Sequence, residues 1–454
     1  MRILFKVLHQ KSHLNATFPL AQRLRDSGHE VIYAGIEQLR DHVEAQGMSY
    51  CVQEEDVYPY LEDRLGDSKL TIWSTFRSWW RNRHLLEMRR EKYIKCDAFD
   101  RLLQATSPHW VLVDSPYTFF ALSIFKHKIP FAVIESMTVL DRESGCPPLD
   151  TTYIPKSSYF SQFICALHWQ RYFARRWLLG ILGVRLEYNK RFVIQTAVNG
   201  GVDPSIISFD RYFHIGLSNV PEINLSLREL DFPRVGASNR CYFGAMLRIN
   251  RVETGGDYSF RTRFDNIVVQ RAQGKPVVYC SLGTAGWRYE GVQRFLNRVI
   301  EASRNASWAL IVTIGSTQDF SQFIDVPSNI AVFQSVPQLE VLRNVDLMIT
   351  HGGMNSITEC ILSTVPMLVY PGTLEIDQGG NAARVVYNQL GLSGRLTSDS
   401  SSKIRKKIAA ILADKRYYNR VGALRRAIEA NDVSNTKIFS LLPSIASQSI
   451  GCVL

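Results

Sequence analysis

The clearest chemical signal lies in the last third of the chain, where an apolar run at 347–350 leads into His-Gly-Gly at 351–353. Paired glycines let the backbone turn sharply and let an anionic group approach closely. A helix that begins near Met354 would point its unpaired N–H groups and positive dipole end toward the same place. The pattern therefore predicts a phosphate site, with Asn355 and Ser356 as further donors. Taken alone, it fits an ordinary tight turn equally well.

A carboxylate lies one turn deeper on the same predicted helix. Glu359 follows Asn355 by four positions and Ser356 by three, so the three side chains share a face. A carboxylate repels phosphate but suits the paired hydroxyls of a ribose, as acidic residues do in dinucleotide folds. The segment therefore predicts a site for a nucleoside diphosphate.

Such a site needs a scaffold that brings the ends of several strands together. Short apolar runs alternate with segments of helical period in the first half of the chain, and the alternation recurs more clearly in the second half. The runs lie at 3–8, 31–34, 110–113, 131–134, 277–281, 309–314, 330–333, 347–350 and 367–369. Strands that alternate with helices predict parallel sheets covered on both faces. We therefore expect an α/β protein with two doubly wound domains.

Length and composition support this organisation. The 454 residues exceed what a single hydrophobic core holds together. The stretch 236–261 is rich in glycine and polar residues and weak in period, so it predicts a linker between domains at 1–235 and 262–430. No apolar run reaches the ~18 residues of a membrane span, and charges within the first apolar segment speak against a signal peptide.

Charge and cysteine usage narrow the setting. The eight cysteines are scattered without a Cys-x-x-Cys pair, which favours a reducing, cytoplasmic location. The formal net charge of +11 attracts phosphates of any kind and so does not select a partner. We expect no nucleic-acid partner.

The segment 336–384 resembles the donor-binding signature of the UDP-glycosyltransferases of the GT-B fold, in particular the bacterial macrolide and zeaxanthin glycosyltransferases. The stretches 276–284 (PVVYCSLGT) and 230–233 (LDFP) resemble other parts of the same family, in the same order along the chain. The resemblance implies two Rossmann-like domains that face each other across a cleft. The first would bind the acceptor and the second the donor, and the tail at 431–454 would pack back on the first.

The resemblance also assigns donor contacts to the uracil and ribose, the diphosphate and the sugar. The implied residues are Ser281, Gly283, Thr284, Val336, Gln338, His351, Gly353, Asn355, Ser356, Glu359, Asp377 and Gln378. Two features depart from the family pattern. Ser335 replaces a tryptophan common in plant members, and the segment before Asp377 is longer than usual, which makes Glu375 a competing sugar contact.

The resemblance further implies that His13, directly before the first predicted helix, is the general base. An imidazole with a pKa near ~6.5 suits this role at neutral pH. Asp114, at the end of another apolar run, matches the family's partner carboxylate, which would fix the tautomer of the imidazole. His9 is a weaker candidate, and Asp114 read by itself fits a helix N-cap.

The implied reaction transfers a hexose, glucose by preference, from a UDP-sugar to a hydroxyl of a small hydrophobic acceptor with inversion. No Asp-x-Asp motif occurs, so we predict no metal and no cofactor. Glu359 favours UDP over dTDP, and the Asp-Gln pair at 377–378 favours glucose. A UDP-sugar epimerase, a membrane-lipid glycosyltransferase and a non-catalytic binder of UDP-sugars stay open as alternatives.

Two helical segments at 73–95 and 163–192 mix aromatic residues with arginine. They fit amphipathic helices that pack on the domain, the wall of a pocket for an apolar substrate, or a surface that touches a membrane.

Overall fold

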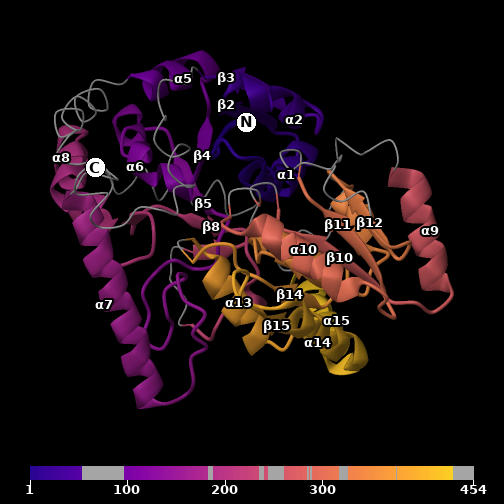
Figure 1. Cartoon of the computed structure of the whole chain (residues 1–454). Coiled ribbons are helices and arrows are strands. Elements are labelled where there is room, and N and C mark those ends of the chain that lie inside the picture. The colour runs from indigo at the N-terminus through magenta and orange to yellow at the C-terminus, as the bar shows by residue number, and fades with distance from the viewer. Residues whose placement is uncertain are drawn as a thin grey trace, which may run out of the picture.

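The computed structural model describes residues 1–53, 97–181, 188–234, 240–243, 260–283, 286, 289–315, 326–374 and 376–432. Two parallel sheets dominate it, each with helices packed against it (Figure 1). The predicted α/β organisation with two sheets is therefore confirmed. Among the helices in the described ranges, none combines the length and the apolar character that a membrane crossing needs.

The first sheet has seven strands in the order β3-β2-β1-β4-β5-β8-β9, and every neighbouring pair runs parallel. The strands are β1 (Arg2–Lys6), β2 (Glu30–Gly35), β3 (Ser49–Val52), β4 (Trp110–Asp114), β5 (Phe131–Glu135), β8 (Glu222–Asn224) and β9 (Arg240–Tyr242). A separate antiparallel pair joins β6 (Ile207–Ser208) to β7 (Gly216–Leu217).

The second sheet has six parallel strands in the order β12-β11-β10-β13-β14-β15. They are β10 (Val277–Ser281), β11 (Ala309–Thr313), β12 (Ile330–Phe333), β13 (Leu347–Thr350), β14 (Met367–Val369) and β15 (Gly391–Ser393). In both sheets the first strand of the domain lies at the centre and the order reverses beside it. Ligands of open α/β sheets bind at such switch points, outside the carboxyl ends of the strands.

Each sheet is buried on both faces, because alternate residues of its central strand belong to different hydrophobic clusters. In β1, Leu4 packs into one cluster while Ile3 and Phe5 pack into another. In β10, Val277 packs into one cluster and Val278 into another. Two-sided burial explains why the inner strands read as continuous apolar runs.

Helices connect the strands and cover the sheets. Those that follow strands of the first sheet are α1 (Lys11–Asp26), α2 (Arg40–Glu44), α5 (Ala98–Thr106), α6 (Thr118–Ala121), α7 (Tyr159–Ile181) and α8 (Lys190–Asn199). Those of the second half are α9 (Phe260–Ala272), α10 (Val292–Ser303), α11 (Gln338–Leu342), α12 (Met354–Leu362), α13 (Gln378–Tyr387), α14 (Ser401–Ala413) and α15 (Lys415–Asp432).

Several boundaries differ from the sequence-based expectation. Strand β9 lies inside the predicted linker at 236–261 and extends the first sheet, so that sheet continues beyond 235. Helix α1 begins at Lys11, which places His13 in its first turn and not in the loop before it. Helix α15 packs on α12 and contacts the turn at Arg228–Leu230. The tail after residue 432, expected to return to the first domain, lies outside the described residues, as does the segment 73–95.

Candidate functional site

The central pair of the site is His13 with Asp114. Asp114 ends β4, beside β1 in the sheet, and His13 lies in the helix that follows β1. The Nδ1 atom of His13 lies 2.7 Å from Asp114 Oδ2, and the same oxygen accepts the backbone N–H of Leu8 at 3.0 Å. The side chains of His13 and Asp114 are 18% and 1% exposed. Asp114 therefore fixes the ring, and the Nε2 atom is the ring nitrogen that remains for a substrate.

The surroundings of His13 favour its protonated form. Burial by itself lowers the pKa of His13, but the charge and hydrogen bond of Asp114 and the charge of Asp377 outweigh it and leave the pKa raised. His9 behaves in the opposite way, because burial and the nearby Lys6 lower its pKa to about 3. His9 is thus a poor proton acceptor, which supports the choice of His13.

The other domain reaches this pair directly. The Nδ2 atom of Asn355, in the first turn of α12, donates to the carbonyl of Ser12 at 2.6 Å. Asn355, expected as a phosphate donor, therefore also ties the N-terminus of α12 to the residue before His13. Asp377, the N-cap residue of α13, lies near enough for its charge to raise the pKa of His13. The site thus lies where the two domains meet.

His351 occupies a slot that two glycines create. A Cβ atom at Gly283 would lie 2.5 Å from His351 Cε1, and one at Gly353 would lie 2.6 Å from its Nε2. Burial lowers the pKa of His351 to about 4, so the ring is neutral near pH 7. Its Nδ1 atom is buried and has no hydrogen-bond partner within the described residues. A neutral ring with an unsatisfied polar atom beside a helix N-terminus suits a phosphate group.

Helix α12 begins at Gly353 as its N-cap, and no side chain caps its first N–H groups. Gln338, at the start of α11, donates through Nε2 to Glu359 Oε2 at 2.6 Å and to Ser356 Oγ at 3.4 Å. Its Oε1 lies 3.3 Å from the hydroxyl of Tyr279 on β10. Gln338 and Glu359, expected to contact the nucleoside, therefore form one connected polar cluster with Ser356, expected to contact the diphosphate.

Asp377 and Gln378 lie at the start of α13. Asp377 accepts the Nδ2 group of Asn381 at 2.7 Å, and burial raises its pKa despite this bond. Gln378 uses both ends of its amide within the protein. Its Oε1 accepts the N–H of Gly372 at 2.9 Å, and its Nε2 donates to the Tyr289 hydroxyl at 2.7 Å. Gln378 thus shapes the loop before α13, a role that the sequence did not indicate.

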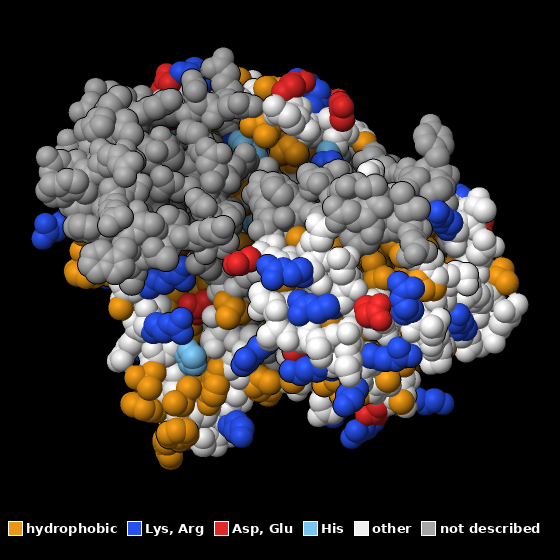
Figure 2. All heavy atoms as spheres, viewed as in Figure 1, with side chains coloured by type: hydrophobic (Ala, Val, Ile, Leu, Met, Phe, Trp, Pro, Cys, Tyr) orange, Lys and Arg blue, Asp and Glu red, His pale blue; other side chains and the backbone are white. Residues whose placement is uncertain are grey.

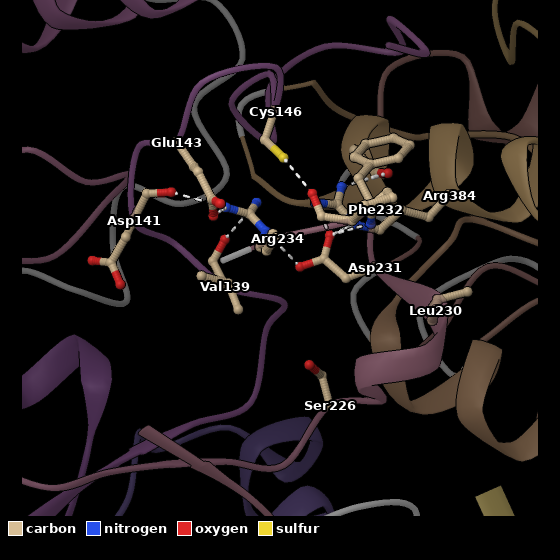
Figure 3. Close-up of polar contacts among 12 residues, drawn as sticks. Val139, Asp141, Glu143, Cys146, Ser226, Leu230, Asp231, Phe232, Arg234 and Arg384 are labelled. Carbon is tan, nitrogen blue, oxygen red and sulfur yellow. Dashed lines mark hydrogen bonds and ion pairs between the residues drawn. The ribbon is translucent and has the colours of Figure 1, made fainter. Parts of the chain in front are cut away.

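The far end of α13 is fixed by a buried ionic cluster (Figure 3). Arg384 is fully buried, and its Nε donates to Asp231 Oδ1 at 2.8 Å across the domain boundary. Asp231 Oδ2 also accepts Arg234 Nε at 2.8 Å, and Arg234 donates to the carbonyls of Asp141 and Val139. Burial raises the pKa of Asp231, but the two arginines outweigh it and leave the pKa lowered. Asp231 therefore links α13 to the loop after β5.

The remaining expected residues fall as follows. Ser281 ends β10 and is buried, and the following Gly283 has a φ of +76°, a conformation that favours glycine. Val336 is partly buried against the core of the second domain. Thr284 and the competing Glu375 lie outside the described residues. The sequence analysis missed Tyr289, Asn381 and Arg384. Asn381 and Arg384 lie within the segment 336–384, but nothing in their spacing indicated a contact with Asp377 or with Asp231.

Comparisons with known proteins indicate the class of protein to which this chain is similar. Residues 298–438 match the family described as erythromycin biosynthesis protein CIII-like, C-terminal domain. The NDP-glycosyltransferase YjiC of Bacillus subtilis (strain 168) is 34% identical over 157 residues, which are 34% of this chain and 38% of that protein. The match to YjiC thus spans well under half the length of that relative.

Two further proteins match over almost the whole chain. The zeaxanthin glucosyltransferase of Pantoea ananas is 23% identical over 92% of this chain and 90% of that protein. The glycosyltransferase VinC, solved in complex with dTDP, has a TM-score of 0.63 at 16% identity and covers 99% of this chain and 100% of its own.

Two parallel α/β sheets that meet at a shared polar site define the GT-B fold, and the structural match supports that class. Residues 298–438 belong to the erythromycin CIII-like family of the model that they match, and over most of its length the chain is similar to a zeaxanthin glucosyltransferase.

Proposed function

We propose that this protein is an inverting glycosyltransferase that moves a hexose, glucose by preference, from a UDP-sugar to a hydroxyl of a small hydrophobic acceptor such as a polyketide, phenolic or terpenoid. The observation that carries the proposal is the His13–Asp114 pair, held at 2.7 Å where the donor domain meets the first domain. A paired base of this kind favours a transferase over an epimerase or a binding protein.

The reaction is a single displacement at the anomeric carbon. His13 Nε2 takes the proton of the acceptor hydroxyl as its oxygen bonds to that carbon. The bond between the carbon and the β-phosphate oxygen breaks, and UDP leaves with the electron pair. Asp114 stabilises the imidazolium that forms, since its carboxylate already lies beside Nδ1.

Negative charge grows on the leaving diphosphate, and fixed donors aimed at it lower the barrier. The uncapped N-terminus of α12, the neutral ring of His351 and the Ser356 hydroxyl are suited to this work. We include Ser281, Gly283 and Thr284 from the sequence pattern. Because these donors supply the stabilisation and no Asp-x-Asp motif occurs, we propose a reaction without a metal or a cofactor.

The donor nucleotide follows from the cluster around Glu359. A carboxylate held by Gln338 at 2.6 Å is oriented to accept a hydrogen bond from a ribose hydroxyl. UDP carries the 2′-hydroxyl and dTDP lacks it, so this contact favours UDP. VinC was solved with dTDP, which makes the comparison between the two donors a necessary test. For the sugar we assign Asp377, which α13 and Asn381 hold in place.

The six cysteines in the described ranges are free thiols, which is consistent with the reducing, cytoplasmic setting that we propose.

The test measures nucleotide release in EDTA from UDP-glucose and dTDP-glucose, with a panel of phenolic and aliphatic alcohols. The variants are His13→Ala, Glu359→Gln and, as a control outside the site, His29→Ala. We expect acceptor-dependent release that His13→Ala lowers about 10²–10⁴-fold, with UDP affinity and the control unchanged. Glu359→Gln should erase the preference for UDP over dTDP. Full activity in His13→Ala, or release only with a divalent metal, would contradict the proposal.

A further inference from the structure

Helix α7 has two faces of different character. One face packs on the protein through Cys165, Trp169, Tyr172 and Arg176, spaced three or four positions apart. Trp169 donates its indole N–H to the carbonyl of Cys146 at 2.8 Å, and Arg176 donates to the carbonyl of Arg211 at 2.8 Å. These contacts fix the orientation of the helix. They therefore determine which side chains of α7 point away from the protein.

The outward face is apolar where a surface helix is normally polar. Its large exposed residues recur at intervals of three, four or seven positions, with a longer gap in the middle of the helix. They are Phe160 (72% exposed), Phe163 (57%), Leu167 (43%), Trp177 (66%) and Ile181 (48%), with Tyr159 (90%) at the tip. Figure 1 shows α7 along the outer edge of the molecule, and Figure 2 shows hydrophobic and basic side chains gathered on that edge. Exposed apolar residues in such number on one helix mark an interaction site.

The charge of this region is predominantly positive. The stretch from 159 to 199 contains six lysines and arginines and one acidic residue, Glu187. Arg171 is exposed in the middle of α7. The half-buried Asp150 lies nearby: burial raises the pKa of Asp150, and the charge of Arg171 acts to lower it. The following helix α8 begins with the exposed pair Lys190 and Arg191 and carries no acidic residue.

We propose that the outward face of α7 rests on an anionic membrane surface, with its aromatic and aliphatic side chains among the lipid headgroups. Aromatic and leucine side chains with flanking basic residues characterise helices that lie in the plane of an interface. Each basic side chain near an anionic leaflet adds to the attraction. The basic residues spread along α7 and α8 therefore complement lipid phosphates.

The positive charge of α7 favours an anionic membrane, and not a second copy of the chain, as the partner of this face. A symmetric contact between two α7 helices would bring their basic side chains together, and α7 has no acidic residue to pair with them. Like charges held together at an interface weaken association. An anionic lipid surface meets the same side chains without this repulsion.

Binding of α7 to a membrane would bring the enzyme close to a hydrophobic acceptor. This part of the inference rests on the proposed function. A hydrophobic alcohol partitions into a bilayer, so a transferase docked there meets a far higher local concentration than in water. The binding itself is independent of the chemistry and is tested without a substrate.

The experiment measures co-sedimentation of the full chain with vesicles of phosphatidylcholine alone and of phosphatidylcholine mixed with phosphatidylglycerol. The variants are Phe160→Ser combined with Phe163→Ser, and Arg171→Gln. Tyr418→Ser is the control, because Tyr418 is an aromatic residue of matching exposure (57%) on the distant α15. Circular dichroism verifies that each variant is folded.

We expect the wild type to bind the anionic vesicles and to lose that binding at high salt. The double variant should weaken binding by about tenfold or more, Arg171→Gln by about fivefold, and Tyr418→Ser should have no effect. Absence of vesicle binding, or binding that the double variant leaves intact, would overturn the proposal. So would a dimer in sedimentation velocity that the double variant dissociates, since the face would then belong to a second copy. Loss of transfer activity with vesicle binding intact would count against the proposed function alone.

Discussion

Replacement of Asp114 by asparagine separates the effect of its negative charge from the effect of the hydrogen bonds that it accepts. Both of its hydrogen bonds, from Leu8 N–H and His13 Nδ1, end on the same oxygen, Oδ2. The other oxygen, Oδ1, is buried without a hydrogen-bond partner among the described residues. An asparagine can therefore place its carbonyl oxygen at the Oδ2 position and keep both bonds. The NH₂ group of the asparagine takes the place of Oδ1. The two hydrogen bonds are kept, and the negative charge of the carboxylate is lost.

The size of the effect follows from this geometry. A hydrogen bond to a charged partner contributes about 1.5–3 kcal/mol and a neutral one about 0.5–1.5 kcal/mol. The imidazolium formed in the transition state therefore loses about 1–2.5 kcal/mol, which corresponds to a decrease in kcat of roughly 5- to 70-fold. Because Asp114 raises the pKa of His13 against the effect of burial, its loss also moves the acid limb of the pH–rate profile to lower pH.

The assay is the pH dependence of nucleotide release under single-turnover conditions, for wild type, Asp114→Asn and Asp114→Ala. The alanine variant removes the hydrogen-bond acceptor as well, so its rate should fall below that of Asp114→Asn. UDP affinity, measured by calorimetry, should match the wild type in both. An Asp114→Asn variant with an unshifted acid limb would refute the assignment of His13 as the base, whatever its rate.

Two further changes test the donor side and the domain boundary. Gly353→Ala should lower kcat/KM about 10²-fold, because its Cβ would lie 2.6 Å from His351 Nε2 while the local φ of −65° accepts alanine. Gly422→Ala on α15 is the matched control with ordinary contacts, and equal activity of the two variants would exclude the steric argument. Asp231→Asn should destabilise the fold by about 3 kcal/mol because Arg384 is left buried without its charged partner. An unchanged midpoint of thermal unfolding would show that the pair does not contribute.

Strands that form a continuous apolar run of residues could be predicted from the sequence, and three short edge strands could not. The runs at 277–281, 330–333, 347–350 and 367–369 coincide with strands buried on both faces. The strands β3, β9 and β15 have three or four residues and are only partly buried. Short, partly polar strands carry neither an apolar run nor a clear alternation, so their pairing depends on the sheet that they join.

In the candidate site, features set by local spacing could be predicted from the sequence, and contacts between distant residues could not. The turn at His351–Gly353 and the position of Glu359 on α12 could be predicted, because spacing within one helix determines which side chains share a face. The pair of Asp231 with Arg384 joins residues 153 positions apart, and neither lies in a pattern that predicts a contact. Gln378 could be named from its motif, but its use inside the protein depends on Tyr289 and on a loop that only tertiary structure brings near.

Helix α13 connects the proposed donor site to the first domain. Asp377 is its N-cap residue, and the N–H of Gly380 in its first turn donates to the carbonyl of Leu149 in the first domain at 2.8 Å. Its last turn carries Arg384, bound to Asp231 from the segment that ends the first domain. The helix that follows Asp377, the residue proposed to contact the sugar, is therefore fixed at both ends by residues of the first domain. An exchange of the second domain at residue 262 would separate α13 from both contacts, so it should transfer donor specificity only if the partners of α13 are exchanged with it.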